Sequence, residues 1–177
     1  PPSFAARSLA AAAAGGASPS STVTPSTPPA PEVMDLPLAL RLHNTLTRAK
    51  EPFRPAPPPP GAPRPTATLY VCGVTAYDLS HVGHARAYVA FDVLYRVLAA
   101  TGHDVTYARN FTDVDDKIIA RAALNNEEPG ALAERMAAEF HADMDALGCA
   151  RPSAEPRATA YIPAMVAAIE RIVAHGH

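Results

Sequence analysis

Lysine is scarce in this sequence. Only Lys50 and Lys117 occur among its 177 residues, and the formal net charge at pH 7 is −2. Proteins that bind nucleic acids usually carry a basic stripe, because lysine and arginine neutralise the phosphate backbone. The charge composition therefore does not indicate a nucleic-acid partner.

Cysteine is also scarce, and long apolar runs are missing. The two cysteines, Cys72 and Cys149, are too few for a disulfide scaffold and suit a reducing compartment. We therefore expect no disulfide partner for either thiol. The sequence has no run of about eighteen apolar residues, so we expect no segment that spans a membrane.

Proline is plentiful but concentrated in the first third of the chain. Sixteen of the 20 prolines precede Thr66. Residues 1–37 form an Ala/Ser/Pro-rich head in which Arg7 is the one charge before Glu32. Such a segment cannot bury enough apolar surface to offset its ordering entropy, so we expect disorder. Its acid-free start is typical of a chloroplast or mitochondrial transit peptide, and the alternative is a cytoplasmic protein with a disordered head.

Residues 38–65 are expected to link this head to the folded part. Leu38 to His43 alternates loosely in hydrophobicity and predicts a short strand, followed by a turn at Asn44 and Thr45. Residues 52–65 are so rich in proline that they predict an extended, semi-rigid connector.

Residues 66–126 carry the pattern of a βαβ unit. Residues 66–72 predict a strand, residues 82–100 a helix ended by Thr101 and Gly102, and residues 104–109 a second strand. A strand, a helix and a strand in this order predict two parallel strands with a crossover helix. We therefore expect an α/β fold.

The remainder of the chain is expected to be helical. Thr112 is predicted to cap a helix that ends near Asn125, because Thr112 and Asp115 have the spacing of a capping box. Within residues 127–177, a second helix is predicted to run to Gly148 and a third to start at Pro156. Apolar residues recur on one stripe of both, namely Leu132, Met136, Phe140, Met144 and Leu147, then Ile162, Met165, Val166, Ile169, Ile172 and Val173.

The turn between the first strand and its helix carries two histidines. His81 and His84 are three residues apart and can share one face of the opening helical turn. The N–H groups and the dipole of a first helical turn favour anionic oxygens. Gly83 leaves room for a flat group against the backbone. This stretch therefore predicts a nucleotide-binding site.

The same stretch resembles a known enzyme family. His81-Val82-Gly83-His84 is similar to the His-Ile-Gly-His signature of class I aminoacyl-tRNA synthetases, with Val in place of Ile. The flanking residues 69–78 and 109–118, together with residues 44–48 and 151–159, resemble the cysteinyl-tRNA synthetase family. The resemblance covers roughly residues 41–177. It implies the N-terminal half of a Rossmann-like class I nucleotide-binding domain, followed by a helical insertion.

The resemblance also implies an activity and its residues. Family members activate cysteine with ATP and transfer it to tRNA(Cys), and ATP is expected to act with Mg²⁺. His81 and His84 correspond to catalytic residues, and Gly83 joins them in binding ATP. Thr75 and Thr112 correspond to positions beside the amino-acid pocket. Cys72 corresponds to the first ligand of a zinc ion that binds the substrate thiolate.

Other family features are missing from the sequence. The Lys-Met-Ser-Lys-Ser loop is absent, and so are the other zinc ligands, since Cys149 matches none of them. We therefore expect these 177 residues to be an N-terminal fragment that is inactive alone. Two alternatives stay open: a cysteine ligase of the same fold from mycothiol synthesis, and a non-catalytic, truncated binding protein.

Overall fold

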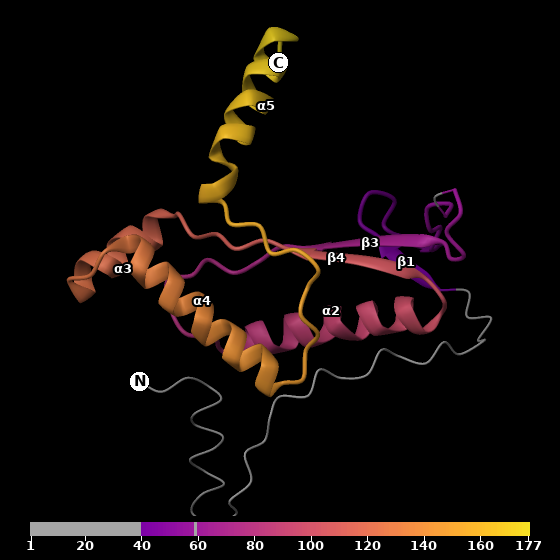
Figure 1. Ribbon diagram of the computed structural model, residues 1–177, viewed down its shortest axis with the longest axis horizontal. Helices are drawn as coiled ribbons and strands as arrows, with labels where there is room; N and C mark the ends of the chain where they lie inside the picture. The colour runs from indigo at the N-terminus through magenta and orange to yellow at the C-terminus, as the bar shows by residue number, and fades with distance from the viewer. Residues whose placement is uncertain (1–39, 59) are drawn as a thin grey trace, which may run out of the picture.

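The computed structural model describes residues 40–58 and 60–177 (Figure 1). In chain order the elements are β1 Arg41–Asn44, β2 Ala49–Pro52, β3 Thr66–Val71, α2 Val82–Ala100, β4 Asp104–Arg109, α3 Asp116–Asn125, α4 Pro129–Ala146, a 3₁₀ turn at Thr159–Tyr161 and α5 Ile162–Ala174. The expected head at residues 1–37, and the start of the expected strand at Leu38, lie outside the described residues.

The first two strands form an antiparallel hairpin. β1 pairs with β2 from Arg41 opposite Pro52 to Asn44 opposite Ala49. The turn expected at Asn44 is confirmed, because its Oδ1 accepts a hydrogen bond from the Leu46 N–H at 2.9 Å. The second strand was not expected, and it includes Pro52, the first residue of the predicted connector. Its end is instead paired, which shortens the connector.

The expected βαβ unit is confirmed. β3 and β4 are parallel, with Thr66 opposite Asp104 and Val71 opposite Arg109. α2 lies along one face of this pair (Figure 1). β3 alternates between buried and exposed residues, as a strand with one covered face should. The opposite face of β3 is open, and Tyr70 is 63% exposed there.

The predicted cap of α3 is wrong. α3 starts at Asp116, and Asp115 caps it by accepting a hydrogen bond from the Lys117 N–H at 2.8 Å. Thr112 instead continues the sheet, since its N–H donates to the Val74 carbonyl and its carbonyl accepts from the Ala76 N–H. A residue whose backbone pairs with a neighbouring segment cannot start a helix. The end of α3 is as expected, with Asn126 in the left-handed conformation.

The core lies between the sheet, α2, α3 and α4. α4 supplies the largest share of this core and starts at Pro129. The apolar residues predicted for α4 are buried, except Leu147 at its end. The buried core consists of Leu69, Val71, Ala76, Tyr88, Tyr107, Phe111, Ile118, Ala122, Leu132, Ala133, Met136, Ala137, Phe140 and Met144.

The segment after α4 is extended, so the prediction of a helix starting at Pro156 is wrong. Ala154 and Arg157 form parallel bridges to Ala108 and Phe111. The Phe111 N–H donates to the Pro156 carbonyl at 2.9 Å, which uses that carbonyl in a sheet-like bond. Residues 153–157 therefore extend the parallel sheet beside β4, and the chain after β4 is not wholly helical.

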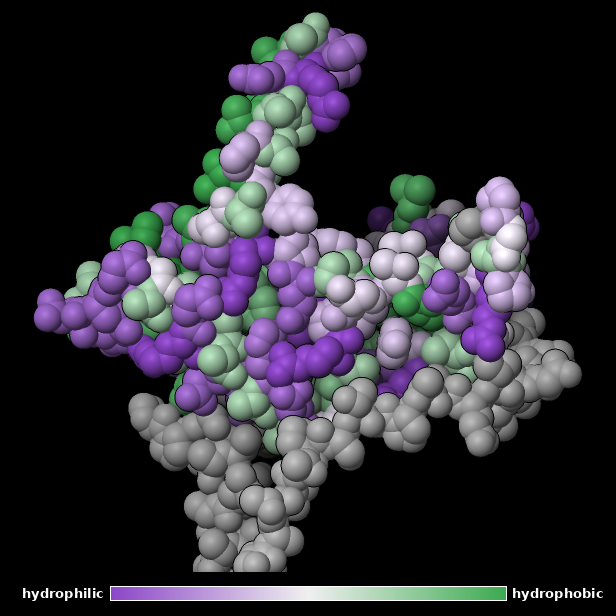
Figure 2. Space-filling model, viewed as in Figure 1, coloured by the Kyte–Doolittle hydropathy of each residue, from purple (hydrophilic) through white to green (hydrophobic). Residues whose placement is uncertain are grey.

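α5 projects away from the rest of the molecule (Figure 1). Its predicted apolar stripe is present but exposed, as the green residues along this helix in Figure 2 show. Ile162 is 47% exposed and Val173 is 63% exposed. The helix itself is confirmed and ends at Ala174. Among residues 40–58 and 60–177, no helix is long and apolar enough to cross a membrane.

Candidate functional site

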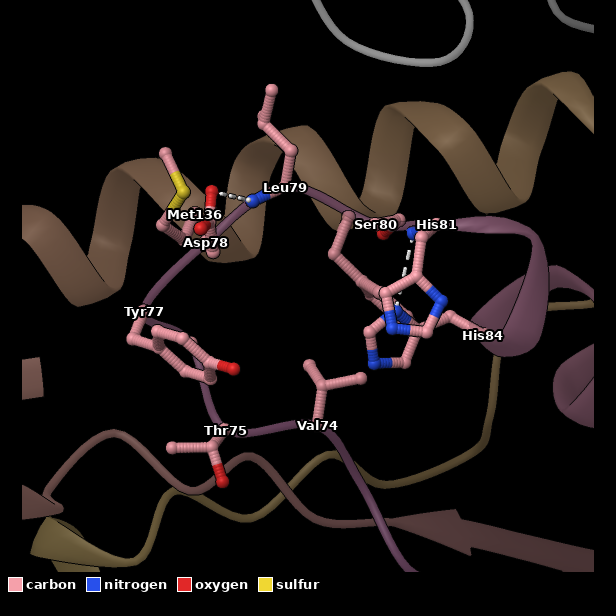
Figure 3. A pocket seen from close by; sticks show the side chains of 11 residues that line it. Val74, Thr75, Tyr77, Asp78, Leu79, Ser80, His81, His84 and Met136 are labelled. Atoms are coloured by element: carbon pink, nitrogen blue, oxygen red, sulfur yellow. Dashed lines mark hydrogen bonds between the residues drawn. The ribbon is translucent and has the colours of Figure 1, made fainter. Parts of the chain in front are cut away.

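A pocket lies between the loop that follows β3 and one side of α4 (Figure 3). Its volume is about 150 Å³, below the range of about 300–1,000 Å³ for drug-sized ligands. It would therefore hold a small ligand or one part of a larger one. Its lining residues are Val74, Thr75, Ala76, Tyr77, Asp78, Leu79, Ser80, His81, His84, Met136 and Phe140.

His81 and His84 form a reciprocal cap at the start of α2. The His81 Nδ1 accepts a hydrogen bond from the Gly83 N–H at 3.0 Å, and the His84 Nδ1 accepts from the His81 N–H at 3.2 Å. The two rings stack with centroids 4.0 Å apart, and both lie on the pocket side (Figure 3). The spacing that suggested a shared face is thus confirmed.

The cap determines which ring nitrogen carries the proton. A neutral imidazole that accepts at Nδ1 carries its hydrogen on Nε2. Both rings therefore offer an Nε2–H group to a ligand. Burial and the neighbouring His81 lower the pKa of His84 below its usual 6.5, which favours this neutral form. The pair can donate two hydrogen bonds to anionic oxygens without itself being charged.

Gly83 is required by the cap. A Cβ at this position would lie 2.8 Å from the His81 Cε1 and 2.9 Å from its Nδ1. The glycine therefore makes room for the His81 ring, and its predicted contact with ATP stays a prediction. The N–H groups of His81 and Gly83 are both taken up by imidazoles. The imidazole Nε2–H groups remain as donors to an anion.

Thr75 and Thr112 are brought together across the sheet. They form a parallel bridge beyond the last pair of the β3–β4 ladder. Thr75 lines the pocket, with its hydroxyl turned away from the imidazole pair (Figure 3). Thr112 is half-buried, and its hydroxyl accepts a hydrogen bond from the Asn110 Nδ2 at 3.4 Å. Both lie at the carboxyl ends of parallel strands, where this fold class binds ligands.

The far rim of the pocket carries charged groups. The Lys117 ammonium lies 5.6 Å from the centroid of the Tyr77 ring, and Arg121 forms an ion pair of 2.6 Å with Asp78. The Tyr77 hydroxyl points into the pocket (Figure 3). This rim therefore adds one hydroxyl and a nearby cation to the imidazole donors.

Cys72 lies apart from this pocket. It is exposed and follows Tyr70 on the open face of β3. Zinc sites in proteins need three or four ligands, and residues 40–58 and 60–177 contain no group of three His, Cys, Asp or Glu side chains that could hold a metal ion. Cys72 alone does not make a zinc site in this part of the chain.

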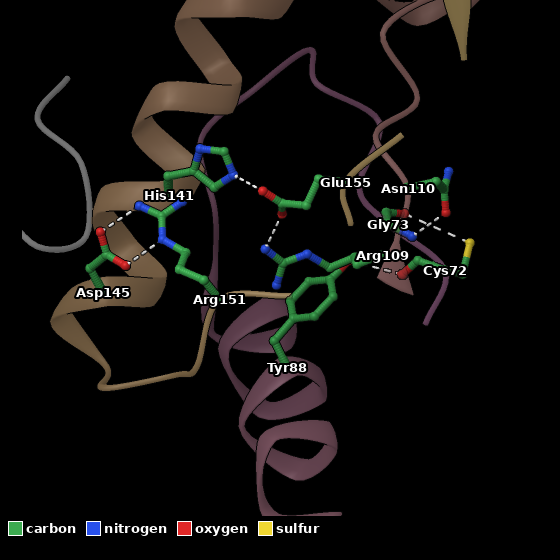
Figure 4. Close-up of polar contacts among 9 residues, drawn as sticks. All are labelled: Cys72, Gly73, Tyr88, Arg109, Asn110, His141, Asp145, Arg151 and Glu155. Atoms are coloured by element: carbon green, nitrogen blue, oxygen red, sulfur yellow. Dashed lines mark hydrogen bonds and ion pairs between the residues drawn. The ribbon is translucent and has the colours of Figure 1, made fainter. Parts of the chain in front are cut away.

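The structure adds three residues that sequence analysis did not assign to the site (Figure 4). The Tyr88 hydroxyl donates to the Cys72 carbonyl at 3.2 Å, and the Asn110 Oδ1 accepts from the Gly73 N–H at 2.8 Å. Burial raises the pKa of Tyr88 to about 12, so its hydroxyl remains a donor. Two signals for Asn110 were present in the sequence: it is a polar residue just after a strand, and it lies within residues 109–118, which carry the family resemblance.

Arg109 is the third added residue and is 1% exposed. Its guanidinium packs 4.8 Å from the Phe140 ring centroid and pairs with Glu155 at 2.5 Å. Glu155 also contacts the His141 Nε2 at 2.9 Å. Burial opposes the charge on Glu155, but these two hydrogen bonds outweigh it and lower the pKa of Glu155. This network ties residues 153–157 to the end of β4.

Comparison with known proteins assigns the family. Residues 62–177 match the family model of the tRNA synthetases class I (C) catalytic domain. Among curated relatives, the cysteine–tRNA ligase of Mannheimia succiniciproducens is 52% identical over 138 residues, which cover 78% of this chain and 29% of the relative. The cysteine–tRNA ligase of Delftia acidovorans is 54% identical over 135 residues, covering 76% of this chain and 28% of the relative.

The family and the fold class expected from the resemblance agree with these matches. The chain spans less than a third of the length of the curated relatives that it matches. The matched region contains β3, α2, β4 and both histidines of the cap. The chain therefore belongs to the family of class I tRNA synthetases (C), a family of ligases, and its residues 62–177 are catalytic-domain sequence.

Proposed function

We propose that the whole protein charges tRNA(Cys) with cysteine at the expense of ATP. The observation that carries this proposal is the reciprocal cap of His81 and His84, which directs two Nε2–H donors at the pocket beside Thr75. The similarity to cysteine–tRNA ligases supports the choice of amino acid.

The first step would form an aminoacyl-adenylate. A carboxylate oxygen of cysteine attacks the α-phosphorus of ATP, a new O–P bond forms, and the bond to the β-phosphate bridging oxygen breaks. Pyrophosphate leaves with the bonding electrons. Negative charge develops on the phosphoryl oxygens, and the Nε2–H groups of His81 and His84 would stabilise it. The step needs no general base, because the carboxylate is already ionised.

The second step would transfer cysteine to the tRNA. A hydroxyl of the terminal ribose attacks the carbonyl carbon of the adenylate, and an ester bond forms. The bond between this carbon and the phosphate oxygen breaks, AMP leaves with the bonding electrons, and the hydroxyl proton passes to the AMP phosphate or to water. Thr75 and Thr112 would hold the amino acid during both steps, since they meet at the strand ends next to the pocket. The formal net charge of the chain is −2, so we expect the main tRNA contacts to lie elsewhere in the whole protein.

Two metal ions belong to this proposal. Mg²⁺ would accompany ATP, as in most enzymes that cleave phosphoanhydrides. Cys72 would contribute one thiolate to a zinc ion, and the other ligands would have to come from outside the described residues. No step above depends on zinc.

The test is an amino-acid panel with the whole protein. We expect ATP–pyrophosphate exchange with cysteine and much less with serine, and transfer of cysteine to tRNA(Cys). An amino sugar offered as the acceptor should remain unreacted. Activation of cysteine followed by transfer to the amino sugar, with none to tRNA, would contradict the proposal.

A further inference from the structure

The parallel ladder between β3 and β4 is interrupted just before the pocket. Its last regular pair is Val71 opposite Arg109, and pairing resumes at Thr75 opposite Thr112. Three residues, 72–74, therefore lie opposite two, Asn110 and Phe111. An extra residue on one strand is a β-bulge, and bulges next to active sites change the direction of side chains.

A single peptide unit at this bulge is held on both sides. Its carbonyl, that of Cys72, accepts from the buried Tyr88 hydroxyl of α2. Its N–H, that of Gly73, donates to the Asn110 side chain after β4. Because the peptide unit is planar, fixing both polar groups fixes the orientation of the whole unit. Figure 4 shows the two side chains reaching this peptide from different elements.

The space around this peptide unit is also restricted. A Cβ at Gly73 would lie 1.4 Å from the Asn110 carbonyl oxygen, so the two segments touch through their backbones. Val74 and Thr75, which line the pocket, follow directly. Asn110 also donates to the Thr112 hydroxyl, which leaves the Thr112 proton free for another acceptor. Asn110 thus contacts Thr112 directly, and the peptide unit held by Tyr88 and Asn110 lies two residues before Thr75.

We propose that Tyr88 and Asn110 are positioning residues for the amino-acid side of the pocket. This inference rests on the proposed function, because it needs the pocket to bind cysteine. The two residues do not touch the substrate. They act by holding the Cys72–Gly73 peptide, and Asn110 acts also by orienting Thr112.

The test compares matched variants of the whole protein. Tyr88→Phe removes the hydroxyl and keeps the buried ring, while Asn110→Leu removes the amide at a similar size. Tyr95→Phe is the control, because Tyr95 lies two turns later on α2 and packs against Tyr107 at 5.6 Å. The readouts are KM for cysteine and for ATP in pyrophosphate exchange, and amide hydrogen exchange of residues 72–76.

We expect Tyr88→Phe to raise KM for cysteine by about 5- to 30-fold, because the variant loses one hydrogen bond. KM for ATP should stay within about twofold, because the histidine cap is untouched. Amide exchange of residues 72–76 should accelerate more than that of β4, and most in Asn110→Leu. Tyr95→Phe should change none of these.

Equal changes in both KM values, or no change in either, would overturn the inference while the proposed function stands. Unchanged exchange of residues 72–76 in both variants would also overturn it, since the peptide would then not depend on these side chains. A wild-type protein that does not activate cysteine would contradict the proposed function itself.

Discussion

The pocket has two walls, and they are built in different ways. The histidine wall is local, since its hydrogen bonds join residues two and three positions apart. The other wall, at Val74 and Thr75, follows the peptide unit between residues 72 and 73. Tyr88 and Asn110 hold this peptide unit from 16 and 37 positions away along the chain. A local wall forms with its helix, whereas the other wall depends on the whole sheet being assembled.

This difference predicts how each wall fails. Damage to the long-range wall should destabilise the fold, because the same contacts join β3, β4 and α2. Damage to the histidine wall should cost little stability and act mainly on the chemistry. The predictions below test this contrast, beginning with the largest expected effect.

Gly73→Ala should have the largest effect on stability. Its Cβ would overlap the Asn110 carbonyl oxygen, and this contact is with backbone, so the two segments must separate. We expect the free energy of unfolding to fall by about 3 kcal/mol or more. Gly130→Ala is the control, because its nearest obstacle is the flexible Glu128 side chain. Thermal unfolding that is equal for both variants would contradict the account.

Arg109→Met should have the second-largest effect on stability. It leaves Glu155 partly buried without its cation, and we expect a loss of about 2–3 kcal/mol, reduced because the Glu155 side chain is 21% exposed. Arg151→Met is the matched control. The Arg151–Asp145 pair is about half exposed and should contribute less than about 1 kcal/mol. Urea unfolding of the two variants measures the difference. Similar losses of unfolding free energy in both variants would contradict this account.

His81→Ala should cost about 1 kcal/mol, the usual contribution of a helix cap. His81→Asn should recover most of this stability, because an asparagine Oδ1 can accept from the Gly83 N–H as the His81 Nδ1 does. Neither variant should recover activity, since neither carries the Nε2–H donor. Chemical denaturation together with a pyrophosphate exchange assay separates the two effects. Equal stability of the Ala and Asn variants would argue against the cap.

The smallest effect concerns pH. The pKa of His84 is lowered in the folded state, by burial first and then by His81. The unfolded chain therefore binds more protons, and stability rises with pH. The contribution of neutral His84 is fully present above pH 6.5 and is lost as pH falls through the folded pKa. We expect the wild type to lose stability on acidification through this range, and His84→Asn to lose less.

The sequence was a good guide where structure is local. The bounds of β3, α2 and β4 were predicted, because each has a clear period and a turn at its ends. The cap of α3 was predicted wrongly, because Thr112 and Asp115 are both residue types that commonly cap helices. Only the pairing of Thr112 with Val74 and Ala76 decides between them.

Long-range pairing explains the other errors. Pro156 has the signal of a helix start, but its carbonyl is used by Phe111. α4 and α5 show the same kind of apolar stripe, yet Leu132 is 1% exposed and Ile169 is 57% exposed. A pattern predicts that a helix has an apolar face, not what that face contacts. Likewise, only the structure reveals the hydrogen bond from the Tyr88 hydroxyl to the Cys72 carbonyl.

The most direct test of the account is the activity of His84→Asn in the whole protein. The asparagine Oδ1 can replace Nδ1 in the cap, but the residue has no donor at the position of Nε2. We expect stability near that of the wild type and cysteine-dependent pyrophosphate exchange slower by about a hundredfold. The matched control is His103→Asn, at the far end of α2. Wild-type exchange rates in His84→Asn would contradict the claim that the imidazole pair serves the chemistry.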